Sequence, residues 1–319
     1  MSTGSSPLEV NPGPIGAPSF GGKRILLTGG SGFIGSCLGP LLDGLGHTVY
    51  PVSRSTGFDI SNVSSFRPFL GASINTVIHL AGHTFVPESW NSPDEYYRVN
   101  SLGTQSALDF CRAVDATMIY ISAYIYGKPQ YLPIDEQHPV EPNNPYAHSK
   151  WFGEELCRFY SRFMGVRTII LRPFNLYGPG QDERFLIPTI LTQYRNNGVV
   201  NILDTTPRRD FLHVADFAEA CASAVTHEVD YALFNVGSGY SLSVAEIVQI
   251  MSRVTGDKIT VTATGTPRRN EILETIADIR AIKDAMGWTP HRSFSEGLLA
   301  LVRTTNHSHA SNHQAGAAT

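Results

Sequence analysis

Cysteine is scarce in this chain: four occur among 319 residues, and no two form a CxxC pair. Small disulfide-bonded folds and zinc sites need clustered cysteines, so we expect reduced thiols and no metal site. Long apolar runs are also missing, since no segment reaches the roughly 20 residues that a membrane-spanning helix requires. These absences point to a cytoplasmic protein without a membrane partner.

Charge of one sign is not in excess either. Lysine and arginine number 24, aspartate and glutamate 28, and the net charge of −4 offers no basic surface for nucleic acid. Residues 1–22 are rich in glycine, proline and serine, and they lack the basic start and apolar core of a secretory signal. Residues 304–319 contain few apolar side chains. We expect a disordered leader and a disordered tail.

Between these ends, short apolar runs alternate with segments of helical period. They predict strands over 23–28, 47–53, 74–82, 116–122 and 166–174, and helices over 33–45, 93–113 and 146–163. Such alternation is typical of a parallel sheet covered on both faces. The sequence therefore predicts an α/β fold with a Rossmann-type, doubly wound parallel sheet, whose ligands bind beyond the carboxyl ends of the strands.

The pattern loosens in the second half of the chain. We expect a dinucleotide-binding domain over 23–176, to which the chain returns near 214–239. Residues 177–303 should mainly form a smaller, mixed α/β C-terminal domain that binds the substrate. Its expected elements are helices over 185–196, 214–226, 243–255 and 294–303 and a strand over 199–203.

A glycine-rich turn, TGGSGFIG (28–35), follows the first predicted strand directly. Glycines at this place permit a tight turn, close approach to a pyrophosphate and close packing of helix on strand. The start of the next helix offers amide donors and a partial positive charge to phosphates. We predict a dinucleotide site that includes Gly29, Gly32, Phe33, Ile34 and Gly35.

The end of the second strand bears on the choice of cofactor. Ser53 and Arg54 stand where an acid would bond the 2′-hydroxyl of NAD, and an arginine there suits the 2′-phosphate of NADP. NADP(H) is favoured, NAD(H) is the alternative, and Arg54 could instead be a solvated loop residue. Asp59, followed by Ile60, could receive the adenine amino group or cap a helix over 61–70.

Tyr146 and Lys150 are four residues apart on a predicted helix, so their side chains share one face. A lysine ammonium and a positive nicotinamide ring favour the phenolate and so lower the tyrosine pKa. Ser122 ends the preceding strand, where its hydroxyl can orient a carbonyl oxygen. We predict that these three residues are catalytic; an ordinary amphipathic helix and a strand cap are the alternatives.

Together these motifs resemble the extended short-chain dehydrogenase/reductase family, often described as NAD-dependent epimerases and dehydratases. The resemblance spans about 23–303 and includes TGGSGFIG, HLAG, VNSLGT, NPYAHSK, RPFNLYGPGQ and RRDFLHVADFAEA. It implies catalytic roles for Ser122, Tyr146 and Lys150. The cofactor contacts that it adds are Leu80, Ala81, Gly82, Tyr146 and Lys150. The substrate contacts that it implies, for a nucleotide-diphosphate sugar, are Thr84, Ser122, Asn175, Arg209 and Arg268. The two arginines could instead form interdomain ion pairs.

The motifs also bear on the reaction. Ala123 and Tyr124 follow Ser122 where dehydratases of the family carry Asp-Glu, so a 4,6-dehydratase is disfavoured. The HLAG and RPFNLYGPGQ segments look like those of GDP-4-keto-6-deoxy-mannose reductases. We predict a reductase of the C4 keto group of a nucleotide-activated (deoxy)hexose. A 4-epimerase that retains NAD is the alternative, and a non-catalytic dinucleotide sensor is a third, against which the intact catalytic set argues.

The resemblance further implies a homodimer, because two helices of this family commonly pair with their mates in a four-helix bundle. The corresponding helices here, 93–113 and 146–163, carry more apolar side chains than one sheet face needs. An exposed apolar patch usually marks an interface. The side chains concerned are Tyr96, Leu102, Leu108, Trp151, Phe152, Leu156 and Phe159.

Overall fold

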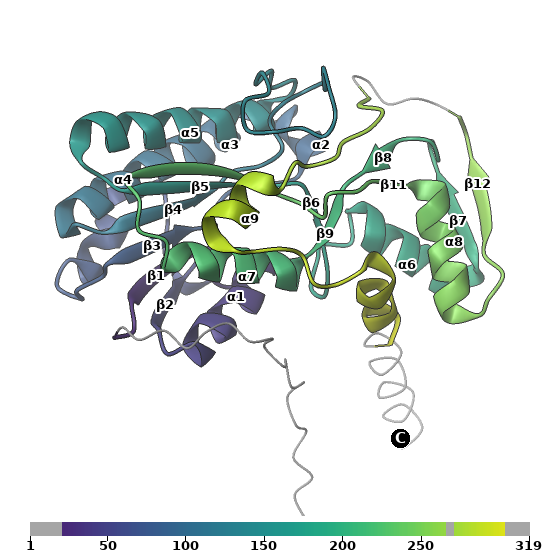
Figure 1. The fold of residues 1–319 in the computed structure, drawn as a ribbon, viewed down its shortest axis with the longest axis horizontal. Coiled ribbons are helices and arrows are strands. Elements are labelled where there is room, and N and C mark those ends of the chain that lie inside the picture. The colour runs from purple at the N-terminus through teal and green to yellow at the C-terminus, as the bar shows by residue number, and fades with distance from the viewer. Residues whose placement is uncertain (1–20, 266–270, 304–319) are drawn as a thin grey trace, which may run out of the picture.

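The structure is a computed structural model that describes residues 21–265 and 271–303. The leader over 1–20, the tail over 304–319 and Arg268 lie outside the described residues. The described chain forms a large α/β unit and a smaller mixed lobe beside it (Figure 1). None of the described helices is long and apolar enough to cross a membrane.

The large unit is built on a six-stranded sheet in which all strands are parallel, in the order β10-β5-β4-β3-β1-β2. Nearly every residue of the four central strands is buried, as expected for a sheet covered on both faces. The Rossmann-type fold is thus confirmed. The strands are β1 (Arg24–Thr28), β2 (Thr48–Val52), β3 (Thr76–His79), β4 (Thr117–Ile121), β5 (Thr168–Pro173) and β10 (Tyr231–Val236).

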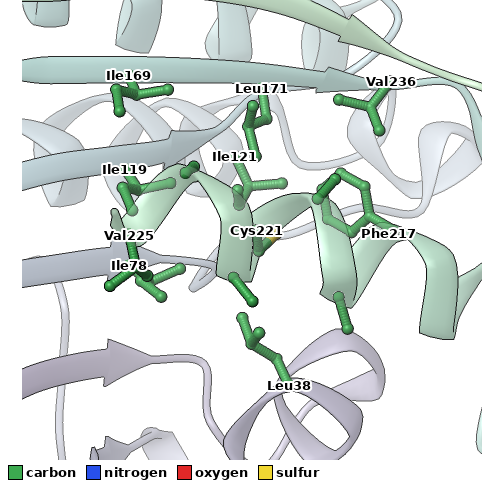
Figure 2. Packing of buried hydrophobic residues seen from close by; sticks show 14 of the residues in the cluster. Leu38, Ile78, Ile119, Ile121, Ile169, Leu171, Phe217, Cys221, Val225 and Val236 are labelled. Carbon is green, nitrogen blue, oxygen red and sulfur yellow. The ribbon is translucent and has the colours of Figure 1, made fainter. Parts of the chain in front are cut away.

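Successive side chains of the strands pack alternately into two hydrophobic cores, one on each face of the sheet. On β1, Ile25 and Leu27 join the core shared with α1 (Phe33–Gly44), α7 (Val214–Val225) and α9 (Arg280–Met286), whereas Leu26 joins the opposite core. Figure 2 shows Phe217, Cys221 and Val225 of α7 among strand side chains, with Leu38 of α1 beside them. The opposite face carries α4 (Gly103–Val114) and α5 (Pro145–Met164).

The single helix predicted over 93–113 is wrong in detail. The structure has α3 (Pro93–Tyr96), a π-helical segment η3 (Tyr97–Leu102) and then α4. A hydrophobic period does not distinguish i+4 from i+5 hydrogen bonding, so the sequence could not show this change. Such π-helical turns are frequent at functional sites.

Residues 214–236 supply α7 and β10 to the large unit. Ile282 of α9 and Trp288 are buried in the same core, a second return of the chain that the sequence did not indicate. Short helices occupy the connections of this unit: η1 (Arg54–Thr56), η2 (Val63–Phe69) and α2 (Val86–Ser89).

The smaller lobe has its own apolar core between helices and short strand pairs. Its helices are α6 (Leu186–Asn197), α8 (Val244–Thr255) and a segment over 294–303. Its pairs are β6 (Asn175–Tyr177) with β9 (Phe211–His213), β7 (Val199–Ile202) with β12 (Thr260–Ala263), and β8 (Arg208–Arg209) with β11 (Leu242–Ser243). Only β7 was predicted, from the apolar residues Val199, Val200 and Ile202; strands of two or three residues carry no readable alternation, and β12 alternates valine and alanine with threonine over only four residues.

Candidate active site

A cavity of about 700 Å³ lies beyond the carboxyl ends of the sheet strands and reaches the smaller lobe. Its walls come from the turn after β1, the segments that follow β3, β4 and β5, the start of α5 and the lobe. Most of the predicted site residues meet here although they are far apart in sequence. They are Gly29, Gly32, Phe33, Ile34, Gly35, Leu80, Ala81, Gly82, Thr84, Ser122, Tyr146, Lys150, Asn175 and Arg209.

The glycine turn fits a bound dinucleotide. Gly29 has φ +73°, and an added Cβ would lie 2.8 Å from the Ala81 nitrogen. At Gly35 an added Cβ would lie 2.5 Å from the Gly29 oxygen. The first glycine therefore makes the turn, and the second lets α1 start close against it. The N-cap of α1 is Gly32, which has no side chain to bond the first amides, so these stay available to phosphate oxygens.

The loop after β2 stands beside this turn. Ser31 Oγ lies 3.1 Å from Ser55 Oγ, which lies 2.8 Å from Ser53 Oγ. Arg54 begins the short helix η1, and it forms no ion pair within the described part of the chain. Arg54 does not line the cavity itself. This loop thus places hydroxyls and a guanidinium beside the turn, and the charge of Arg54 also acts on the Asp59 carboxylate further along the chain.

Asp59 and Ile60 also lie off the cavity wall. Asp59 Oδ1 accepts hydrogen bonds from the backbone nitrogen and hydroxyl of Ser61, at 3.0 and 2.7 Å. The helix that follows, η2, is capped by Asn62, so the capping alternative for Asp59 is wrong. Ile60 is buried against Gly103, which leaves only its backbone for a ligand.

All three predicted catalytic residues line the same cavity. Ser122 follows β4 directly, and its buried Oγ has no hydrogen-bond partner among the residues described. Tyr146 and Lys150 lie on the first turns of α5, whose N-cap Asn144 accepts a hydrogen bond from the Ala147 nitrogen at 2.9 Å. A buried hydroxyl without a partner is unusual unless a ligand completes it.

The expected fall in the pKa of Tyr146 depends in part on a positive nicotinamide ring, which the protein alone does not supply. Burial, aided by the nearby hydroxyl of Tyr96, raises the pKa of Tyr146 above its ordinary value. Burial lowers the pKa of Lys150 to about 8, although Cys157 and Glu154 act in the opposite sense. In the protein alone, Tyr146 is therefore a proton donor and Lys150 remains mostly a cation at neutral pH.

Asn100, which the sequence analysis did not single out, fixes the segment that faces these residues. Asn100 Oδ1 accepts a hydrogen bond from the backbone nitrogen of His83 at 2.8 Å. Asn100 Nδ2 donates hydrogen bonds to the backbone oxygen of His83 at 3.1 Å and to Ser149 Oγ at 2.9 Å. An added Cβ on Gly82 would lie 2.8 Å from Asn100 Oδ1. The π-helical turn thus ties the segment after β3 to α5. The motif VNSLGT contained the only sequence signal.

The substrate side of the cavity contains the remaining predicted contacts. The backbone nitrogen and the side-chain Nδ2 of Asn175 both donate hydrogen bonds to the backbone carbonyl oxygen of Asp210, at 3.0 and 3.2 Å. Arg209 is partly buried and pairs with Glu271 at 2.5 Å, and both residues line the cavity. Sequence reasoning missed Glu271. Its only signal was the charge alternation after Arg268, in the segment PRRNE.

A second group missed by sequence reasoning lies at the cavity mouth. The Arg184 guanidinium stands 4.3 Å from the ring centroid of Phe85 and 3.3 Å from the carboxylate of Glu88. Arg184 follows β6 and Phe85 follows β3, so this contact joins the smaller lobe to the large unit. Phe185 packs edge-on against Phe85 with ring centroids 5.8 Å apart.

Comparisons with known proteins agree with this geometry. The NAD dependent epimerase/dehydratase family matches residues 25–237. The chain is 30% identical to the GDP-6-deoxy-D-mannose reductase of Pseudomonas aeruginosa, over 88% of this chain and 96% of that protein. It is also 30% identical to the UDP-glucose 4-epimerase of Homo sapiens, over 84% of this chain and 92% of that protein. The solved structure of RMD from Pseudomonas aeruginosa complexed with NADPH has a TM-score of 0.81 at 30% identity, covering 88% of this chain and 98% of the other.

Proposed function

Because the chain belongs to the NAD dependent epimerase/dehydratase family, we propose that it reduces the C4 keto group of a nucleotide-activated hexose, in particular a deoxyhexose, with NADPH. The observation that carries the proposal is the convergence of Ser122, Tyr146 and Lys150 on the cavity that also contains the glycine turn. The reductase relative acts on a GDP-linked deoxy sugar by its name, and the similarity covers nearly the whole of both chains.

Each residue has a definite task in this reaction. Bound NADPH supplies the hydride. Tyr146, protonated because it is buried, donates a proton to the carbonyl oxygen. Ser122 Oγ, which lacks a partner in the described chain, donates a hydrogen bond to the same oxygen. Lys150 holds the nicotinamide ribose. Arg209 binds the diphosphate together with Arg268, which lies outside the described residues, and Thr84 and Asn175 contact the sugar.

The choice of NADPH rests on the loop after β2. Arg54 forms no salt bridge with the residues described, and the hydroxyls of Ser53 and Ser55 lie beside it. A guanidinium without a carboxylate partner suits a 2′-phosphate. The similar structure bound to NADPH supports this choice. Asp59 and the Ile60 backbone would serve the adenine.

A 4-epimerase that retains NAD is the second candidate, and the similarity to UDP-glucose 4-epimerase favours it. The two activities use the same three residues. They differ in whether the cofactor leaves after one hydride transfer or stays to return the hydride to the other face. All four cysteines are free, which suits the reducing cytoplasm in which either enzyme would act.

One experiment separates these candidates. Purified protein is denatured, and the released nucleotides are identified; protein freed of ligand is then assayed for NADPH oxidation with a nucleotide-linked 4-keto sugar. A reductase releases little cofactor and oxidises NADPH stoichiometrically with the sugar. Tightly retained NAD together with interconversion of UDP-hexoses identifies the epimerase. Dinucleotide binding without turnover of either substrate class would refute both and leave the sensor.

We also propose a homodimer formed by the helical segment that runs from α3 through η3 to α4, by α5 and by their mates. Leu102 on η3 and Phe152, Phe159 and Phe163 on α5 are exposed, with Phe163 64% exposed, whereas Trp151 and Leu156 are partly buried. Tyr96 and Leu108, which the sequence analysis placed on this surface, are buried within their own chain instead. Light scattering at micromolar concentration should give the mass of a dimer, and Phe159→Glu should give a monomer. A monomeric wild-type protein would refute the interface.

A further inference from the structure

We propose that Tyr120 is a positioning residue for Lys150: its ring holds the lysine ammonium toward the cavity, and Gly153 makes the room that this ring requires. The inference rests on the proposed function, in which Lys150 holds the nicotinamide ribose. Neither Tyr120 nor Gly153 lines the cavity. Tyr120 therefore acts through Lys150 and not on the substrate.

The ring and the hydroxyl of Tyr120 hold the lysine at two points. Lys150 Nζ stands 4.8 Å from the centroid of the ring, within the range of a cation–π contact. The Tyr120 hydroxyl donates a hydrogen bond to the Lys150 carbonyl oxygen at 3.2 Å. Tyr120 is on β4, a central strand, and it is fully buried. One side chain thus fixes both the backbone and the charged end of Lys150.

Gly153 is the condition for this arrangement. A Cβ at position 153 would lie 2.2 Å from the Tyr120 hydroxyl oxygen and 2.6 Å from Cζ of the ring. No side chain fits there unless the ring moves. Glycine inside a helix costs stability relative to alanine. Its presence in the third turn of α5 is explained by the Tyr120 ring that packs against it.

The aromatic neighbour that stacks on the Tyr120 ring is neutral. His79 stacks on it with ring centroids 5.8 Å apart, and His79 Nδ1 and Nε2 lie 2.8 and 3.2 Å from the hydroxyl oxygens of Thr28 and Thr104. Burial and the charge of Lys150 lower the pKa of His79 to about 3, so no second cation opposes the ammonium. The ring is therefore held in place by hydrogen-bonded neighbours without competing charge.

An aromatic face is a useful partner for this lysine. Within the described residues Lys150 forms no salt bridge. A carboxylate partner would occupy the ammonium N–H groups, whereas a ring attracts the charge and leaves those donors for a ligand. Glu154 and Cys157 approach Lys150 along α5, and both favour its charged form. The geometry keeps Lys150 charged and its hydrogen bonds available.

The test compares two substitutions and two ligands. Tyr120→Met removes the ring but fills most of its space, and Tyr120→Phe keeps the ring and loses only the hydroxyl. Binding of NADPH and NADH is measured by fluorescence, and binding of ADP, which lacks the nicotinamide ribose, serves as the control. We expect Tyr120→Met to weaken both dinucleotides roughly 3- to 30-fold and to leave ADP unchanged. Tyr120→Phe should bind like the wild type.

A double substitution shows whether the effect passes through the lysine. In a Lys150→Met background, Tyr120→Met should weaken dinucleotide binding no further. If Tyr120→Met does not fold, Gly153→Ala replaces it, because the added methyl must displace the ring, and the same selective loss is expected. Equal weakening of ADP and dinucleotides, or normal dinucleotide binding by Tyr120→Met, would overturn the role of Tyr120. A wild-type protein that binds neither NADPH nor NADH would overturn the proposed function and this inference together.

Discussion

Replacing Lys150, the lysine that we propose to be catalytic, should make the protein more stable. Lys150 is only 4% exposed, and burial lowers its pKa from the ordinary value of 10.5 to about 8. A buried ammonium without a carboxylate partner is a cost that the fold bears for function. Lys150→Met removes the charge and keeps a flexible apolar chain of similar length. We expect activity to be lost and the free energy of unfolding to rise.

The size of the gain follows from the pKa. At about 1.4 kcal/mol for each tenfold change in proton affinity, a fall from 10.5 to about 8 corresponds to about 3 kcal/mol at pH 7. The cation–π contact with Tyr120 offsets about 1–2 kcal/mol of this cost of burying the ammonium. The net gain should therefore lie between about 1 and 2 kcal/mol.

The pH dependence makes the prediction specific. Below about pH 8 both the folded and the unfolded chain carry the Lys150 proton, so the folded state bears the full cost. Between about 8 and 10.5 the unfolded chain binds more protons than the folded one, so the wild-type protein gains stability as pH rises. The advantage of Lys150→Met should therefore be complete at neutral pH and shrink above pH 8.

Urea unfolding at pH 7.0 and pH 9.5 measures both quantities, with Lys128→Met as the control at an exposed lysine. The control should match the wild-type protein at both pH values. If Lys150→Met is no more stable than the wild type at pH 7, or if its advantage does not change with pH, the burial cost assigned to Lys150 is wrong.

Three further substitutions test the site. Tyr146→Phe should lower kcat about 10²- to 10⁴-fold. The free energy of unfolding should change little, because the Tyr146 hydroxyl makes no hydrogen bond with the described residues. A variant that keeps half of the wild-type activity would remove Tyr146 from the mechanism. Ser53→Asp combined with Arg54→Asn should shift preference from NADPH toward NADH in titrations, and equal weakening of both would show that Arg54 does not read the phosphate. Arg209→Ala should raise KM for a nucleotide sugar roughly 10- to 150-fold, but not KM for a small carbonyl compound. Because Arg209 pairs with Glu271, adding Glu271→Gln should restore any stability lost in Arg209→Ala. Equal loss of activity on the nucleotide sugar and on the small carbonyl compound would show that Arg209 is structural.

The sheet could be predicted from sequence because its strands are almost wholly apolar, and most are followed by a segment in which apolar residues recur with the period of a helix. The limits of β1, β4 and β5 differ from prediction by at most two residues at either end. Elements without such a pattern were missed. β8 and β11 have two residues each, and α9 packs on the large unit although it begins 44 positions after the end of β10 (236 to 280). Nothing local marks these long-range contacts.

The cavity was predictable for a related reason. In a parallel sheet the carboxyl ends of the strands meet at one edge, so motifs that follow β1, β3 and β4 must converge. Residues that meet only through tertiary contact have no such rule. Arg209 and Glu271 are 62 positions apart, and Tyr120 and Lys150 are 30 apart. No periodicity in the sequence connects either pair, and neither contact was foreseen.

The protonation of Tyr146 bears on the direction of the reaction. Burial raises its pKa in the protein alone, so Tyr146 carries its proton, as the reduction of a carbonyl requires. To accept a proton from an alcohol, Tyr146 would need positive charge nearby to favour the phenolate. Lys150 supplies one charge, and only an oxidised nicotinamide would add a second. When reduced cofactor is bound, Tyr146 therefore stays protonated and can act as an acid. An epimerase must also oxidise its substrate, so it needs NAD to stay bound. Whether Tyr146 acts as an acid or as a base therefore depends on which form of the nicotinamide is bound.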